Sequence, residues 1–198
     1  MFTNAALILF AISTTGTPGP NNIMMLTSGL NFGIRRSVPH WLGIITGVPI
    51  MLIALGLGLD QIFRQFPVLF TSLKVLGCGY LLYLAWKIAF MKVNPEPNHQ
   101  SKKPMSYIQG LLFQWINPKA WVMCLSAISL FVDIERPMLM QILSIGFTFF
   151  LIGALTVGCW MVTGSKISQL LAKPQQQRIF NFSMAALLVV SLYPMLQV

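Results

Sequence analysis

The first long apolar run of this chain is interrupted by two prolines and two glycines, and this interruption limits the possible folds more than any other feature. The stretch Thr14–Asn22 reads Thr-Thr-Gly-Thr-Pro-Gly-Pro-Asn-Asn and lies inside a run without charged residues, Phe2–Ile34. Pro18 and Pro20 each lack a backbone N–H, and each disfavours the helical conformation in the residue before it. A helix over Ala5–Thr15 must therefore stop here, and a second helix must begin near Pro20.

Composition identifies the environment of this break. Of the 198 residues, 56% are hydrophobic and only 9% are charged, whereas about a quarter of the residues in a soluble domain carry a charge. The chain is therefore expected to be one integral membrane domain. Six runs with few or no charges predict transmembrane spans: Phe2–Ile34, Val38–Leu59, Phe66–Trp86, Met105–Val132, Pro137–Ser165 and Ile179–Val198.

The first break is expected at mid-membrane. A helix over Ala5–Thr15 is about 16 Å long, roughly half of a ~30 Å hydrocarbon core. Irregular backbone at that depth survives only where protein covers it or where it lines a watered cavity. The restarting helix presents free N–H groups and its positive dipole end, which favour an anionic ligand. The expected binding residues at this break are Thr17, Pro18, Gly19, Pro20, Asn21 and Asn22.

The net charge of +9 indicates topology rather than a nucleic-acid partner. Most Lys and Arg residues fall in the loops after the first, third and fifth spans: Arg35, Arg36, Lys87, Lys92, Lys102, Lys103, Lys166, Lys173 and Arg178. The loops after the second and fourth spans hold only Arg64 and Arg136. The positive-inside rule then places the first set of loops in the cytoplasm and both termini in the periplasm.

The fourth span repeats the break of the first. The polar linker 92–104 divides the chain into residues 1–91 and 105–198, each with three predicted spans. Because three is odd, the second half is upside down relative to the first, as in inverted-repeat transporters. The fourth span is interrupted at Gln114–Lys119, where Asn117 can cap a new helix and Pro118 suits its first position. The expected fold is all-α, with six transmembrane helices as two inverted three-helix repeats whose first and fourth helices are broken.

Proline spacing supports the repeat, and glycine pairs predict close helix packing. Pro20 and Pro118 are separated by the same number of residues as Pro39 and Pro137. Pro39 is therefore expected to open the second span. The pairs Gly29 and Gly33, and Gly43 and Gly47, form small-x-x-x-small faces that would let another helix approach closely.

Lys119 is a cation placed directly at the second predicted break. An ammonium this deep in a membrane is costly, so it is a candidate for binding a substrate carboxylate. It can equally be a lysine satisfied by exposed carbonyls where a half-helix ends, and the two roles are compatible. The expected site residues at this break are Gln114, Asn117, Pro118 and Lys119.

These segments together resemble the LysE superfamily, particularly its RhtB-type amino-acid exporters. The resemblance covers essentially the whole chain and rests on the segments Thr17–Asn22, Gly33–Ser37, Leu76–Leu81, Trp86–Lys87 and Asn117–Lys119. It implies a protein of the bacterial inner membrane that exports amino acids or their derivatives, driven by the proton gradient. Many relatives have Asp after Pro-Gly-Pro, whereas this chain has Asn21, as in members similar to the cysteine/O-acetylserine exporters. The spans then hold no carboxylate for proton coupling.

The residues themselves favour a secondary transporter for small neutral amino acids. A carboxylate suits the helix N-termini and an ammonium suits exposed carbonyls, while a cationic side chain would lack an acidic partner. The expected partners are the amino acid and the lipid bilayer, with homo-oligomer formation left open and no cofactor required. One alternative is a metal or cation exporter, which would need clustered ligands. A membrane enzyme or redox carrier, the other alternative, would need a nucleophile with a base or a dithiol.

Overall fold

The computed structural model describes residues 5–59, 65–91, 103–133, 135–171 and 173–193. The predicted cytoplasmic linker 92–104 and the C-terminus at Val198 therefore lie largely outside the described residues. The helices are α1 (Ala5–Gly16), α2 (Pro20–Ala54), η1 (Leu55–Leu59), α4 (Pro67–Ala89), α5 (Tyr107–Phe113), η2 (Gln114–Ile116), α6 (Pro118–Phe131), α7 (Met138–Leu170) and α8 (Pro174–Val190). No strand occurs among the described residues, and the prediction of an all-helical protein is confirmed.

Helix lengths fit a membrane protein that contains half-spans. Within the described residues, Pro20–Gly58 and Met138–Ser168 are long and apolar enough to cross a membrane. By contrast, α1 has 12 residues and α6 has 14, so each is about 20 Å long and too short for a ~30 Å core. Large apolar side chains such as Val75, Leu155 and Val190 are exposed, as expected for helices that face lipid.

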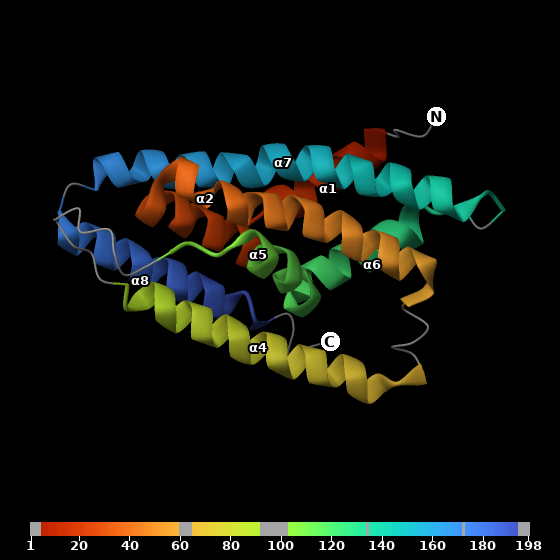
Figure 1. The fold of residues 1–198 in the computed structure, drawn as a ribbon, viewed down its shortest axis with the longest axis horizontal. Coiled ribbons are helices and arrows are strands. Elements are labelled where there is room, and N and C mark those ends of the chain that lie inside the picture. The colour runs from red at the N-terminus through yellow and green to blue at the C-terminus, as the bar shows by residue number, and fades with distance from the viewer. Residues whose placement is uncertain (1–4, 60–64, 92–102, 134, 172, 194–198) are drawn as a thin grey trace.

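The helices run along the long axis of the molecule in two neighbouring groups (Figure 1). Helix α7 lies along α2 and also packs on α1, while α4 and α8 form a separate pair. The C-terminal ends of α7 and α4 and the N-terminal end of α8 lie at one end of the molecule, at the left of Figure 1. The N-terminal ends of α7 and α4 lie at the other end. Helix ends whose loops the charge pattern assigned to the same side of the membrane therefore lie at the same end of the molecule.

Glycines bring α2 into backbone contact with its two main neighbours. A Cβ added to Gly29 would collide with the carbonyl oxygen of Met161 in α7, and one added to Gly164 would collide with that of Leu26 in α2. On its second half, α2 approaches α5 in the same way, where a Cβ on Gly43 would collide with the carbonyl of Tyr107. The predicted packing role is therefore confirmed for Gly29 and Gly43.

The bend in α2 differs from the prediction. Gly33 has φ 73 and ψ 173 and has no atom within 4 Å of an added Cβ. Gly33 therefore turns the chain by a left-handed backbone conformation that glycine adopts readily, rather than packing against a helix. Helical structure resumes at once, and Pro39 lies inside α2. The prediction that Pro39 opens the second span is wrong, because the positive φ at Gly33 separates the two segments earlier.

Replacing Gly29 with alanine should destabilise the protein by about 1–3 kcal/mol, the usual cost of overpacking, because the added methyl group meets rigid backbone of α7. Thermal unfolding of the purified protein in detergent would measure this loss. Gly79→Ala is the matched control, since Gly79 in α4 has no atom within 4 Å of an added Cβ. Equal melting temperatures for the two variants would contradict close packing of α2 on α7.

Candidate functional site

The end of α1 is held by side chains from other helices. The carbonyl groups in the last turn of a helix have no partner within the helix. Here the side-chain amide of Asn22 donates to the carbonyl oxygens of Thr15 and Thr17, both at 2.7 Å. The indole Nε1 of Trp160 in α7 donates to the carbonyl oxygen of Gly16 at 3.1 Å. The first break is therefore a structure fixed by α2 and α7 rather than a loose loop.

The second break is capped by its own asparagine. The chain passes through the 3₁₀ turn η2 and becomes extended at Asn117, with φ −89 and ψ 109. The Asn117 side-chain oxygen accepts a hydrogen bond from the backbone N–H of Lys119 at 3.2 Å, and Pro118 occupies the first helical position. The prediction of this cap is confirmed. Helix α2 is different, because its cap residue Gly19 offers no side chain, which leaves its N-terminus open to a ligand.

Lys119 connects the two breaks. Its ammonium donates to the carbonyl oxygen of Thr17 at 2.7 Å, to the Thr17 hydroxyl at 2.8 Å and to the carbonyl oxygen of Pro18 at 3.4 Å. The lysine stem lies against Gly19, where an added Cβ would stand 2.7 Å from its Cδ. Of the two roles considered for this lysine, these contacts correspond to the one in which exposed carbonyls satisfy the ammonium.

A reciprocal pair of amides joins the halves of the chain. Asn21 Nδ2 donates to Gln114 Oε1 at 2.8 Å, and Gln114 Nε2 donates to Asn21 Oδ1 at 3.1 Å. Gln114 Nε2 also donates to the carbonyl oxygen of Gly110 at 2.9 Å. Because Gln114 is completely buried, this pair fixes the position of α2 relative to the second break with neutral groups alone.

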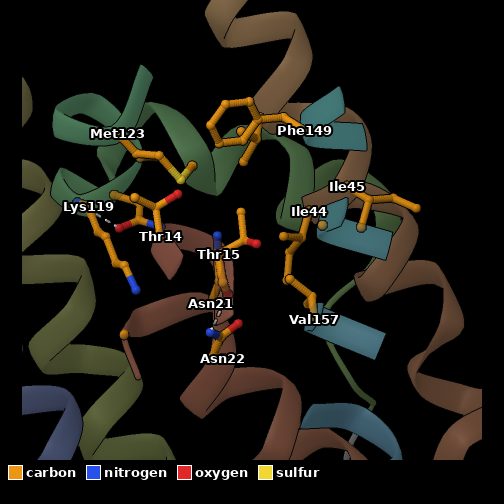
Figure 2. A pocket seen from close by; sticks show the side chains of 15 residues that line it. Thr14, Thr15, Asn21, Asn22, Ile44, Ile45, Lys119, Met123, Phe149 and Val157 are labelled. Atoms are coloured by element: carbon orange, nitrogen blue, oxygen red, sulfur yellow. Dashed lines mark hydrogen bonds between the residues drawn. The ribbon is translucent and has the colours of Figure 1, made fainter. Parts of the chain in front are cut away.

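Both breaks open on one central pocket, which Figure 2 shows from close by. The space inside it, counted together with its open mouth, is about 450 Å³. The lining residues come from α1, α2, α6, α7 and the two breaks: Thr14, Thr15, Gly19, Asn21, Asn22, Ile44, Ile45, Val48, Asn117, Lys119, Ala120, Met123, Phe149, Gly153 and Val157. In Figure 2, Lys119, Met123 and Thr14 face the apolar wall of Ile44, Ile45 and Val157 across the pocket.

Asn22 carries an acceptor that the protein itself does not use. The residue is only 2% exposed, and its Oδ1 has no hydrogen-bond partner. An unsatisfied buried acceptor costs about 1–3 kcal/mol. Since Asn22 lines the pocket next to the uncapped N-terminus of α2, a donor on a bound molecule would remove this cost.

The structure brings half of the predicted site residues into the pocket lining: Gly19, Asn21, Asn22, Asn117 and Lys119. The other five predicted residues do not line the pocket but support the residues that do. Thr17 and Pro18 accept from Lys119, and Gln114 holds Asn21. Pro20 and Pro118 each start a helix.

Sequence reasoning missed the contribution of α7. The Thr156 hydroxyl donates to that of Thr15 at 2.9 Å, and Trp160 binds the end of α1 one turn later. Thr156 and Trp160 share a helical face because they are four residues apart. Nothing local in the sequence indicated that this face meets the first break.

Comparison with known proteins identifies the family of this chain. The family model described as LysE type translocator matches residues 6–192. A cysteine/O-acetylserine efflux protein of Klebsiella pneumoniae is 31% identical over 188 residues, which cover 93% of this chain and 92% of that protein. The protein of the same name from Escherichia coli K12 is 30% identical over 186 residues, 93% of each chain. No solved structure matches. The chain therefore belongs to the LysE family of translocators.

Proposed function

We propose that this protein is a secondary transporter that exports small neutral amino acids or their derivatives across the bacterial inner membrane by alternating access. The family and the names of the relatives, which are cysteine/O-acetylserine efflux proteins, support amino-acid export. The central pocket supports the class of substrate. Coupling to the proton gradient belongs to the proposal through the family resemblance.

The proposal rests on two polar groups that lie in the same pocket and lack hydrogen-bond partners among the described residues. The N-terminus of α2 has no capping side chain, and Asn22 Oδ1 has no partner. A carboxylate would accept from the first-turn N–H groups of α2 and benefit from the helix dipole. The α-ammonium of the same molecule would donate to Asn22 Oδ1. A zwitterionic amino acid offers both groups on one carbon atom.

The remaining lining favours a short, uncharged side chain. Ile44, Val48 and Phe149 form an apolar wall, and the described lining contains no Asp or Glu. A lysine or arginine substrate would lose the hydration of its side-chain charge without gaining a carboxylate partner. A small neutral side chain fits the wall without this cost.

Counterflow in proteoliposomes tests the function directly. Vesicles loaded with unlabelled cysteine under reducing conditions should accumulate labelled cysteine. O-acetylserine should compete with it. Cysteine amide, which lacks the carboxylate, and 3-mercaptopropionate, which lacks the ammonium, should compete at least tenfold less well, since each misses an interaction worth about 1.5–3 kcal/mol. Lysine should also compete poorly, because its side-chain charge would lose its hydration without gaining a carboxylate partner. Exchange of a divalent cation, or no exchange of any amino acid, would contradict the proposal.

We also propose six spans in inverted repeats with both termini outside. Three observations support the arrangement: the alternating ends of the helices (Figure 1), the matching helix starts at Pro20 and Pro118, and the distribution of basic residues. Single cysteines at Gln100 and Gln176, in a background without the native cysteines, should be labelled only after the membrane is permeabilised. A cysteine at Val198 should react from the periplasm without permeabilisation. A cytoplasmic Val198 would leave an odd number of spans and contradict the repeat.

A further inference from the structure

A second pocket lies between the first half of α2, the C-terminal end of α4 and the segment 103–105 before α5. It contains about 510 Å³ including its mouth, a size similar to that of the central pocket. The two pockets share no lining residue. Neither the helix breaks nor the family resemblance pointed to this site.

The inner part of this pocket holds polar side chains without partners. Thr27 is 2% exposed and His40 is 1% exposed. Within the part of the chain that the structure describes, the hydroxyl of Thr27 and both ring nitrogens of His40 make no hydrogen bond. Their neighbour Ser28 is satisfied, since its hydroxyl lies 2.8 Å from that of Ser37. Leaving buried groups unsatisfied costs about 1–3 kcal/mol each, and a polar group of an occupant that bonded to them would remove this cost.

Two exposed lysines add a charge preference. Lys87 of α4 and Lys103 line the same pocket, and its described lining contains no acidic residue. Both side chains are exposed, so they lie toward the open side of the pocket, while Thr27 and His40 lie inside. An occupant with a carboxylate at one end and a hydrogen-bonding group at the other fits this arrangement. Neutral histidine and threonine can each donate and accept.

The two pockets follow one another along the same two segments of α2. Asn22 of the central pocket and Thr27 of the second pocket are about 7 Å apart along the helix axis, and Ile44 and His40 are about 6 Å apart. The intervening Met25 is fully buried and packs with Ile44 and Val157, which line the central pocket. Apolar packing around Met25 thus separates the two pockets along α2.

We propose that the second pocket is a loading site, which holds the amino acid before it passes the apolar packing around Met25 to reach the central pocket. Its carboxylate pairs with Lys87 and Lys103, and its ammonium or polar side chain bonds to Thr27 and His40. This inference rests on the proposed function, because it takes the transported amino acid as the occupant. It predicts two molecules of amino acid per protein.

Equilibrium binding of radiolabelled cysteine to the purified protein in nanodiscs, under reducing conditions, measures this number. The wild-type protein should bind two cysteines and Thr27→Val one. Because the Thr27 hydroxyl makes no hydrogen bond to the described residues, Thr27→Val removes an unsatisfied buried group and should not lower the melting temperature. The double variant Lys87→Met/Lys103→Met should also bind one. The matched control Lys166→Met removes an exposed lysine that lines neither pocket and should bind two.

A variant of the central pocket separates the two sites. Gly153 lines the central pocket and has no atom within 4 Å of an added Cβ. Gly153→Leu should therefore fill the central pocket and bind one cysteine, in the second pocket. The double variant Gly153→Leu/Thr27→Val should bind none. The inference is overturned if the wild-type protein binds one cysteine, Thr27→Val binds as well as wild type, and Gly153→Leu abolishes binding. Counterflow would persist in that case, leaving the proposed function intact. Absence of both binding and counterflow would overturn both proposals.

Discussion

Replacing Pro18, Gly19 and Pro20 together with alanine is expected to abolish transport while the protein still inserts into the membrane. Alanine favours a continuous helix and is fully compatible with a spanning segment. A continuous helix would bury the open N-terminus of α2 in its own hydrogen bonds, and it would remove the carbonyl groups of Thr17 and Pro18 from Lys119. The measurement is cysteine counterflow, with the amount of inserted protein determined on the same vesicles.

Pro39→Ala provides the matched control. This proline lies inside α2, where helical structure continues through it, so its replacement changes no break and should preserve counterflow. Full transport by the triple alanine variant would show that the first break has no role in binding. A single Gly19→Ala change should have a smaller effect, because its methyl group meets only the flexible stem of Lys119.

Lys119→Met should lower the apparent affinity for cysteine roughly ten- to hundredfold, because hydrogen bonds to a charged group are worth about 1.5–3 kcal/mol and substrate binding would have to supply that free energy to reassemble the site. Methionine keeps most of the apolar stem but no longer joins α6 to the carbonyl groups of Thr17 and Pro18. Because this effect acts through the shape of the site, the affinities for cysteine and for cysteine amide should fall by the same factor. Competition in the counterflow assay gives both values.

Lys119→Arg separates charge from shape. Arginine keeps the charge but presents a planar group in place of a compact ammonium, and it should restore part of the affinity. A smaller loss for the amide than for the acid in Lys119→Met would instead mean that Lys119 contacts the substrate carboxylate directly.

The breaks were predictable because local chemistry determines them. Proline cannot continue a helix and favours its first turn, so Pro20 and Pro118 start α2 and α6 as expected. Asn117 caps α6 through its own side chain, an interaction that spans only a few residues. The distribution of basic residues predicted which helix ends lie at the same end of the molecule for a similar reason. Each Lys or Arg favours the cytoplasmic side for its own loop, whatever the tertiary contacts are.

The partners of the breaks were not predictable in this way. Asn21 and Gln114 bond although they are 93 residues apart, and the contribution of Trp160 depends on which face of α7 meets α1. The position of the bend in α2 was missed because a glycine such as Gly33 fits both a packing surface and a left-handed turn. Only the surroundings of the glycine decide between them, and these come from distant segments.

The glycine contacts between α2 and α7 also indicate which parts of the protein are able to move independently. At Gly29 and Gly164 the backbones of α2 and α7 touch each other. No side chain there can rotate to let one helix shift, so α2 and α7 should move as one rigid body. The seam between α2 and α4 is different. Met24, Met91 and Met105 line it, and methionine side chains adapt their shape at little cost. Along this seam α4 should therefore move against α2 more easily than α7 does, and a path from the membrane surface would open here.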